Sequence, residues 1–236
     1  MKYVLDAHTH TIASGHAYNT IREMACAGQS KGLELLGITE HAPAMPGTCH
    51  EFYFHNLRIM DRDAYAIPIL LGSELNIMDD QGTVDLDTEV LVQLDYNIAS
   101  LHPPCIPFMN KDRITQAVIH TIKNPNIHII GHLDDARFEV DYDQVVRAAG
   151  EYRTLMEVNN SSMLPTSYRP NARENYKRML EACEKYRVCI IMNSDAHSDS
   201  TVGRHDMSLA LIEELGFPED LIVNTAVEKF KSFIKK

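Results

Sequence analysis

The sequence lacks several features that mark common protein classes. No apolar run approaches the roughly 20 residues that span a bilayer, and the first ten residues contain no signal-peptide core, so we expect a cytoplasmic protein without a membrane partner. The five cysteines form no C-x-x-C pair, which argues against a disulfide framework or a thiolate zinc site. Lys and Arg number 22 against 33 Asp and Glu, giving a net charge of −11. Binding to nucleic acid phosphates needs a basic surface, so we do not expect a nucleic acid partner.

What the sequence does have is a repeat of apolar runs of strand length, most of them followed by a helical pattern. These strand candidates occupy residues 3–8, 34–41, 67–77, 96–102, 127–132, 154–160 and 188–197. Helical periodicity predicts helices over 114–123, 141–151, 172–186 and 208–215, and capping-box spacing of Thr20 and Glu23 starts an earlier helix that ends at Gly32. Runs such as "IHIIG" are continuously apolar, as in parallel strands covered on both faces. The pattern predicts an α/β fold: a single domain over 1–236 forming a TIM-like (βα)7 barrel.

Nearly all of the predicted strands end in histidine or a carboxylate. In chain order the strand ends supply His8 with His10, then His41, Glu74, His102, His132, Asn159, and finally Asp195 with His197. The carboxyl ends of all strands in a parallel barrel meet at one rim, where active sites are built. Residues two apart on a strand point the same way, so each terminal pair can face the barrel mouth together. The sequence therefore predicts a metal site at the C-terminal rim of the strands.

The predicted ligands are imidazoles and carboxylates, without thiolates. With the nearby His16 they are nine residues: His8, His10, His16, His41, Glu74, His102, His132, Asp195 and His197. Such donors suit Zn2+ or the harder manganese and iron ions, and nine exceed the needs of one tetrahedral ion, so we expect several metal ions. His50 and His55, in the long loop after the second strand, are further candidates. His120 and His128 are expected to be structural.

Eight short motifs carry a family resemblance. They are "DAHTHT", "SGHAYNT", "ITEHAP", "GSELNI", "SLHPP", "GHLD", "VNNSS" and "NSDAH", and they resemble the polymerase-and-histidinol-phosphatase (PHP) superfamily, especially its small stand-alone trinuclear zinc phosphatases. The resemblance implies a distorted seven-stranded barrel, phosphoester hydrolysis, three Zn2+ ions with Mn2+ or Fe2+ as substitutes, and a small homo-oligomer. It further implies one ion on His8, His10, Glu74 and Asp195, a second on His16, His41 and His197, and a third on Glu74, His102 and His132. Glu74 would then bridge two ions.

One residue departs from the family pattern. The family commonly has Asp before the histidine of the second strand, whereas this chain has Glu40 before His41. If this acid orients an imidazole by hydrogen bonding, its extra methylene shifts the ring. The ion assigned to His41 is the one that this change would affect.

The expected reaction is attack of a metal-activated hydroxide on the phosphorus of a small phosphorylated metabolite. Glu74, Asp195 and His197 are the expected catalytic residues, and either Asp195 or a metal-bound water would protonate the leaving group. Arg58 and Arg169 lie in the loops after the second and sixth strands and are candidate substrate ligands, because a guanidinium group matches phosphate.

Three other functions stay open at this point. An amidohydrolase-like enzyme uses similar ligands, but usually with a lysine at the metal centre, and no strand end here supplies one. A PHP-type nuclease or phosphodiesterase is disfavoured by the acidic charge. A non-catalytic metal-binding module is the third. The loop "APAMPGTCHEFYFHNLRIM" is expected to form a lid or pocket wall.

Overall fold

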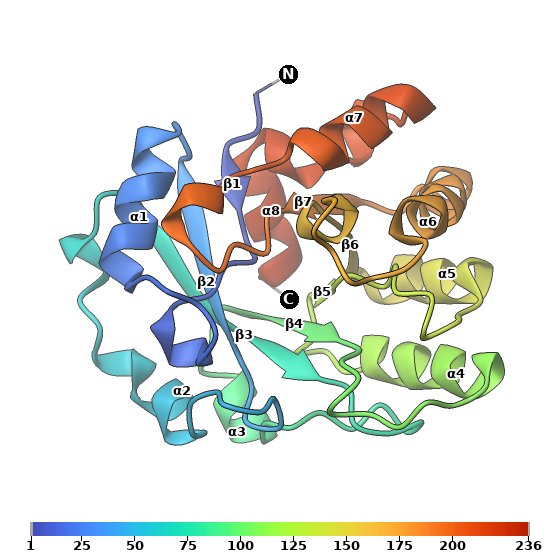
Figure 1. Ribbon diagram of the computed structural model, residues 1–236, viewed down its shortest axis with the longest axis horizontal. Coiled ribbons are helices and arrows are strands. Elements are labelled where there is room, and N and C mark those ends of the chain that lie inside the picture. Colours follow the sequence, from blue (N-terminus) through green and yellow to red (C-terminus); the bar gives the residue numbers. More distant parts are fainter. Residues whose placement is uncertain (1, 236) are drawn as a thin grey trace.

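The computed structural model describes residues 2–235 and shows a ring of parallel strands surrounded by helices (Figure 1). The strands are β1 (Leu5–Asp6), β2 (Leu35–His41), β3 (Ile69–Asn76), β4 (Tyr96–Ser100), β5 (Ile129–Ile130), β6 (Leu155–Asn159) and β7 (Ile190–Asn193). They form one seven-stranded sheet in the order of the sequence, and every neighbouring pair is parallel. The predicted barrel is confirmed. Strands β1 and β5 are shorter than predicted.

Helices cover the outside of the barrel. They are α1 (Ile21–Ser30), α2 (Phe52–Asn56), α3 (Thr88–Leu91), α4 (Lys111–Ile122), α5 (Tyr142–Tyr152), α6 (Ala172–Tyr186), α7 (Asp206–Leu215) and α8 (Val227–Ile234), with short 3-10 turns at Ile12–Ser14, Leu57–Ile59, Arg62–Ala64, Ser161–Met163, Asp199–Thr201, Glu219–Leu221 and Val223–Thr225. The capping box predicted for α1 forms, with Thr20 and Glu23 each accepting the other's backbone N–H. Among residues 2–235, no helix is long and apolar enough to cross a bilayer.

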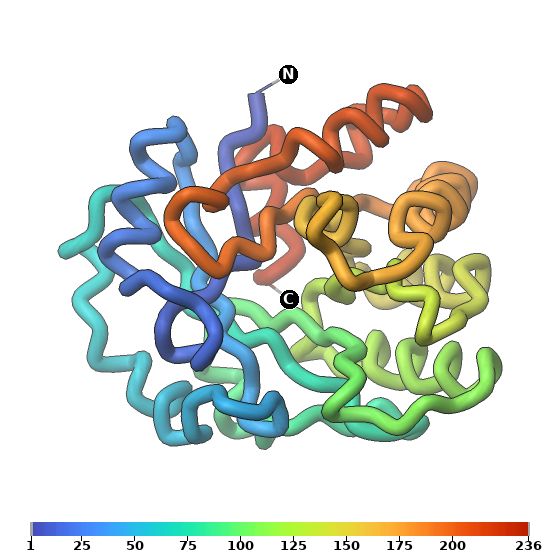
Figure 2. The backbone as a smooth tube through the Cα atoms, viewed as in Figure 1, coloured from blue at the N-terminus to red at the C-terminus, as the bar shows by residue number. Residues whose placement is uncertain are grey.

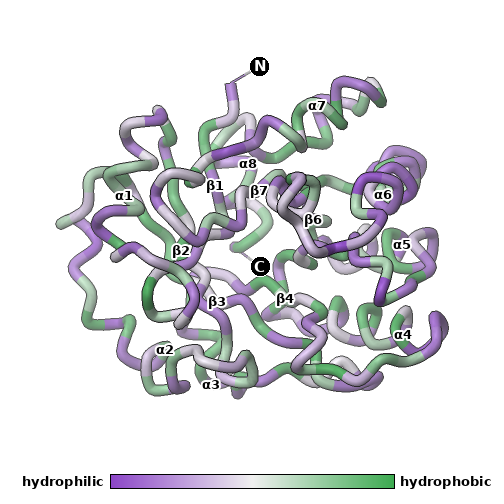
Figure 3. Tube along the Cα trace, viewed as in Figure 1, coloured by the Kyte–Doolittle hydropathy of each residue, from purple (hydrophilic) through white to green (hydrophobic). Residues whose placement is uncertain are grey.

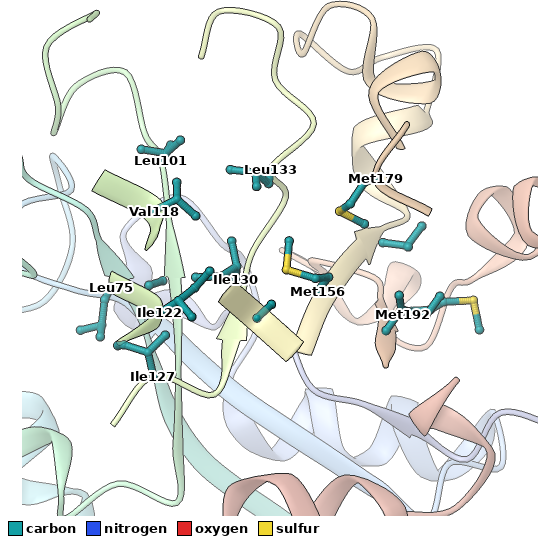
Figure 4. Packing of buried hydrophobic residues seen from close by; sticks show 14 of the residues in the cluster. Leu75, Leu101, Val118, Ile122, Ile127, Ile130, Leu133, Met156, Met179 and Met192 are labelled. Atoms are coloured by element: carbon teal, nitrogen blue, oxygen red, sulfur yellow. The ribbon is translucent and has the colours of Figure 1, made fainter. Parts of the chain in front are cut away.

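The apolar residues form two layers, one inside the barrel and one between strands and helices. The outer layer joins the strands to helices α4, α5 and α6, and Figure 4 shows part of it around Ile130, Met156 and Met179. Along the turns of α4 and α5 hydrophobic and hydrophilic residues alternate, as expected of helices with one buried face (Figure 3). The inner layer contains Leu5, Leu35, Tyr96, Ile129 and Leu155 from the beginnings of five strands, together with Phe230 of α8.

Helix α8 therefore covers the end of the barrel opposite the strand carboxyl ends. The ring of Phe230 packs edge-on against Tyr96, with centroids 5.4 Å apart. In the view of Figure 2, α8 lies within the outline of the ring of strands, whereas the first described residues lie at the upper edge of the molecule. The sequence pattern did not predict α8, or the short helices α2 and α3.

The gap between β7 and β1 is closed without an eighth strand. At the carboxyl ends, Thr9 forms a parallel bridge with Ala196, and the His10 N–H donates to the Ala196 carbonyl over 2.9 Å. At the other end, the side chain of Asn224 donates to the carbonyls of Leu5 (3.2 Å) and Met192 (2.6 Å) and accepts from the Met192 N–H. One buried amide thus satisfies backbone groups of both β1 and β7, and seven strands suffice.

Candidate metal centre

His8 and His10 follow β1 and enter the barrel mouth fully buried. The Nδ1 atom of His8 lies 2.7 Å from a carboxylate oxygen of Glu157 in β6, and Nδ1 of His10 lies 3.1 Å from the Ser14 hydroxyl. Both Nε2 atoms point towards one oxygen of Glu74, at 3.3 and 3.4 Å. Each ring is therefore anchored at Nδ1 and presents Nε2, the arrangement in which a second partner orients a metal-binding imidazole.

Glu74 of β3 lies at the centre of the cluster. The parallel register pairs it with His41 at the end of β2. Its Oε2 atom faces His41 Nδ1 at 2.7 Å and both histidines of the first strand. Its Oε1 atom faces the Nε2 atoms of His132 at 2.7 Å and His102 at 3.4 Å. The two oxygens of one buried carboxylate thus address two separate sets of imidazoles.

His102 and His132 come from the turns after β4 and β5. Nδ1 of His102 lies 2.7 Å from the side-chain oxygen of Asn76. His132 has a φ of 23°, a strained conformation for a residue with a side chain, and its N–H donates to Glu157 over 2.8 Å. The same carboxylate therefore anchors His8 and the backbone of His132.

Asp195, His197 and His16 complete the mouth. Asp195 also has a positive φ, of 53°, and its Oδ2 accepts from Asn159 at 3.0 Å, which leaves Oδ1 3.3 Å from His10 Nε2. His197 lies 4.4 Å from His10 and 4.9 Å from His16, measured between ring centroids. The structure thus brings all nine residues together. Seven of them are buried, whereas His16 and His197 are partly or largely exposed.

Three groups have protonation states that suit a cation, whereas Glu157, Glu74 and Asp195 raise the pKa of His8 well above its usual value against the effect of burial. Burial alone would raise the pKa of Glu74, but His8, His41 and His102 hold it well below its usual range. Burial lowers the pKa of His102 to about 4. Burial, assisted by His41 and His197, also keeps the pKa of His10 well below its usual value. Charged carboxylates and neutral imidazoles with free lone pairs are the forms that bind metal ions.

Unsatisfied polar atoms test whether the residues fit metal ions. In the described part of the chain, the Nε2 atoms of His8 and His10, Nδ1 of His41 and Oε2 of Glu74 are buried without a hydrogen bond. Such atoms are rare in folded proteins because each loses its contact with water. Here the three nitrogens lie within 3.4 Å of the Glu74 oxygen. A metal ion would coordinate these three nitrogens and the Glu74 oxygen, so the residues present are suited to bind metal ions.

Three overlapping sets of donors lie close enough together to share an ion. They are His10, His41 and His197; His8, His10 and Glu74; and His41, Glu74 and His102, each with its donor atoms within 4.8 Å of one another. The sets overlap the three expected groups without matching them. His41 faces Glu74 as well as His197, and His16 belongs to none of the sets although its ring lies 4.8 Å from that of His41.

A match to a family model identifies the chain. The PHP domain model matches residues 6–163, from β1 to the 3-10 turn after β6. The chain belongs to the PHP family. Among curated relatives of this PHP protein, "Probable phosphatase" of Caldicellulosiruptor bescii is 45% identical over 231 residues, covering 98% of this chain and 95% of the relative. "Probable phosphatase" of Acetivibrio thermocellus is 42% identical over 236 residues, covering 100% and 97%. The PHP protein is a phosphatase, a hydrolase of phosphoric ester bonds.

A solved structure of another PHP phosphatase shares the fold. Histidinol phosphate phosphatase from Lactococcus lactis subsp. lactis, complexed with zinc, L-histidinol and phosphate, superposes with a TM-score of 0.63. The match covers 92% of this chain and 95% of that chain at 19% identity. At this identity the likeness concerns the barrel itself.

A cavity of about 720 Å3 opens from the centre of the PHP phosphatase, and its lining includes Arg169, Asp195 and His197. Arg169 is almost fully buried: its Nη1 donates to the Ser162 hydroxyl over 2.8 Å and lies 3.6 Å from Asp195 Oδ2. Burial would lower the pKa of Arg169, but Asp195 and Asp134 raise it, so the guanidinium stays charged. The structure places this predicted substrate ligand beside the centre.

The other predicted substrate ligand lies elsewhere. Arg58 lines a separate hollow with His50 and His55, on the connection between β2 and β3 that runs along the left side of Figure 2. From the loop expected to form a lid, only Met45 lines the main cavity among the described residues. Arg58 and most of this loop therefore lie outside the lining of the main cavity, because Phe54 and Leu57 are buried in the apolar layer outside the barrel and hold the loop there.

Sequence reasoning missed the residues behind the ligands. The sequence pattern places Glu157 in an apolar strand ending in Asn159, and the lone acid in "TLMEVNN" is the one signal of another role. Asn76 and Ser14, which contact His102 and His10, gave no comparable signal. His120 and His128 are structural as expected: His120 Nδ1 lies 2.9 Å from the Asp80 carbonyl, and His128 Nδ1 accepts from the Asn97 N–H.

Glu40 acts on a different histidine from the one expected. Its carboxylate accepts from the hydroxyls of Thr11 and Ser14, and Ser14 in turn contacts His10. The Ser14 hydroxyl also accepts from the backbone N–H of His41. Glu40 thus contacts His10 indirectly, because the Ser14 hydroxyl lies between its carboxylate and the imidazole ring.

Proposed function

We propose that this phosphatase hydrolyses small phosphomonoesters at a centre of three divalent cations, chiefly Zn2+ with Mn2+ or Fe2+ as substitutes, within one domain over residues 1–236. The observation that supports this most directly is the position of Glu74, whose two oxygens face different imidazole sets. A carboxylate can bind one ion at each oxygen, whereas each imidazole offers one free lone pair. Glu74 is therefore suited to bridge two ions.

The proposed ligands follow the family assignment. One ion would be held by His8, His10, Glu74 and Asp195, a second by His16, His41 and His197, and a third by Glu74, His102 and His132. When bound, such cations lower the pKa of water and neutralise charge on phosphoryl oxygens.

The chain's own residues bind the substrate and move the proton. Arg169 donates to the phosphoryl oxygens, because its guanidinium is charged, buried and beside the centre. Asp195, fixed by Asn159, takes up the proton that the attacking water loses and passes it to the leaving oxygen. His197 donates through Nδ1 to the Asp195 carbonyl over 3.0 Å and so fixes the turn that carries both residues.

The test combines metal analysis with a comparison of substrates. Purified protein is expected to hold two to three transition-metal ions per chain, mostly zinc, and to release phosphate from an aryl phosphate and from sugar phosphates. A chelator should abolish this release. Single-stranded DNA should be cut poorly, because the net charge of −11 repels a polyanion. Faster cleavage of DNA than of every monoester would favour the nuclease, and a metal content well below one ion per chain would refute the metal centre.

A further inference from the structure

The cavity in front of the centre is larger than one phosphate group needs. Its volume of about 720 Å3 lies in the range of pockets that enclose a whole organic ligand. Its charged lining is unlike the rest of this acidic chain. Within residues 2–235 the lining includes three arginines, Arg137, Arg169 and Arg204, and a single acid, Asp195. The cavity therefore gathers three guanidinium groups in a molecule of net charge −11, of which Arg204 is held by Asp206 through Nε and Nη2.

One of these arginines is linked to Arg169 through a shared aromatic ring. The guanidinium carbon of Arg137 lies 5.4 Å from the centroid of the Tyr168 ring, and that of Arg169 lies 5.8 Å from the same centroid. Arg169 reaches Asp195, so the three side chains form a row that leads from the centre to the cavity rim. Both guanidinium groups thus lie close to the same aromatic ring.

The geometry of Arg137 leaves part of its guanidinium available. Its Nε and Nη2 atoms donate to the carboxylate of Asp135, and no hydrogen bond of Nη1 occurs within the described part of the chain. The Asp135 carboxylate also accepts the Arg137 N–H over 3.0 Å, so the pair is fixed at its base. The side chain of Arg137 is one third exposed, and that of Asp135 is buried. The pair therefore orients a guanidinium edge towards the cavity.

We propose that Arg137, held on the ring of Tyr168, binds a second anionic group of the substrate, so that the enzyme prefers phosphomonoesters whose organic part also carries a carboxylate or a second phosphate. This inference rests on the proposed phosphomonoesterase function. It makes Arg137 a specificity-determining residue, whereas Arg169 binds the phosphate that is released. A cationic amine in the same place would meet an arginine instead of a carboxylate and is disfavoured.

Matched pairs of substrates test the inference. Glucitol 6-phosphate and 6-phosphogluconate differ in one carboxylate, fructose 6-phosphate and fructose 1,6-bisphosphate in one phosphate, and glucose 6-phosphate and glucosamine 6-phosphate in one amine. We expect kcat/KM to be at least about 10-fold higher for one or both anionic members, mainly through KM, and lower for the amine. The two anionic pairs distinguish a carboxylate from a phosphate as the second group.

Variants of three arginines, Arg137, Arg113 and Arg204, locate the effect. Arg137→Gln should remove the anionic preference while changing hydrolysis of glucitol 6-phosphate less than about 3-fold, and Arg137→Lys should retain part of it. Arg113→Gln is the matched control, because Arg113 also pairs with an aspartate, Asp80, but lies on α4 outside the cavity. The preference should survive there. Thermal melting of each variant reports folding independently of activity.

Defined outcomes overturn the inference. Equal kcat/KM within both anionic pairs refutes it, as does an Arg137→Gln variant that keeps the preference or loses activity equally on all substrates. Loss of the preference in Arg204→Gln alone would move the site to Arg204. If glucitol 6-phosphate is hydrolysed without any anionic preference, only this inference fails. If no monoester is hydrolysed by metal-loaded protein, the proposed function fails with it.

Discussion

At the scale of single residues, the chemistry depends on which atoms are left unsatisfied. Glu74 receives five imidazoles around its two oxygens, and Glu157 accepts from His8, His132 and Asn193. Both carboxylates are completely buried, which is costly unless positive charge compensates them. Glu74 is suited to bind cations directly. Glu157 is suited to hold His8 and His132, which are candidate ligands.

Replacing Glu74 with glutamine tests the bridge. The amide keeps the size of the side chain but removes the negative charge shared by two ions. We expect metal content to fall and kcat/KM to drop by more than about 100-fold, since loss of partners behind the ligands alone costs about 10- to 100-fold. Elemental analysis and phosphate release measure the two effects, with exposed Glu89→Gln as the control. Near-native activity in Glu74→Gln would show that the bridge is misplaced.

Replacing Glu157 with glutamine tests the anchor of His8. One carboxylate oxygen would become an NH2 group facing the His132 N–H or the His8 ring, and the charge beneath the centre would be lost. Zinc affinity, measured by competition with a chelating dye, is expected to fall by about 10- to 100-fold. Circular dichroism of the metal-free variant checks that it folds. Unchanged affinity in a folded variant would contradict the anchoring role.

At the scale of elements, strand ends and glycines set where the ligands meet. β2 and β3 pair in a register that places His41 beside Glu74. In the middle of β2, Gly37 leaves room for the hydroxyl of Tyr96, which crosses the barrel and donates to the Ala7 carbonyl over 2.6 Å. Ala7 lies next to His8, so this contact supports the first ligand pair from below.

Gly37→Ala is therefore expected to destabilise the protein. The added Cβ would overlap the Tyr96 hydroxyl and come within 2.9 Å of the Ala7 Cα. Overpacking of this kind costs about 1–3 kcal/mol of unfolding free energy, measurable by urea denaturation. Gly150→Ala on α5 is the control, since its Cβ would meet only the side chain of Val188. Equal stability of the two variants would mean that β2 shifts freely and that Tyr96 does not fix it.

In the molecule as a whole, the candidate metal centre joins all seven strands. Its candidate ligands come from every strand end but the sixth, and β6 contributes Glu157 from behind. Ions that bind this assembly bind the folded chain and not the unfolded one, so they stabilise the fold by mass action. The effect belongs to the barrel as a unit, because no single element holds a complete site.

Removal of metal should therefore lower the melting temperature. At a free ion concentration 1,000-fold above Kd, one site contributes about 4 kcal/mol, which for a chain of this size corresponds to roughly 10 °C. Calorimetry before and after chelator treatment measures the difference, and added zinc should restore it. The same melting temperature for loaded and stripped protein, with loading confirmed by elemental analysis, would contradict the site.

The seven-stranded barrel and the convergence of nine residues could be predicted from the sequence, because a parallel barrel brings every strand end to one rim whatever the loops do. Helix α1 could be predicted too, since its capping box is a local signal. Tertiary contacts were needed to show that Glu157 lies under His8, that Glu40 acts through Ser14, and that Asn224 and α8 close the barrel. They also place Arg58 outside the cavity and Arg137 in its lining. These facts depend on where loops pack and on contacts between residues distant in the chain, and such packing leaves no periodic pattern in the sequence.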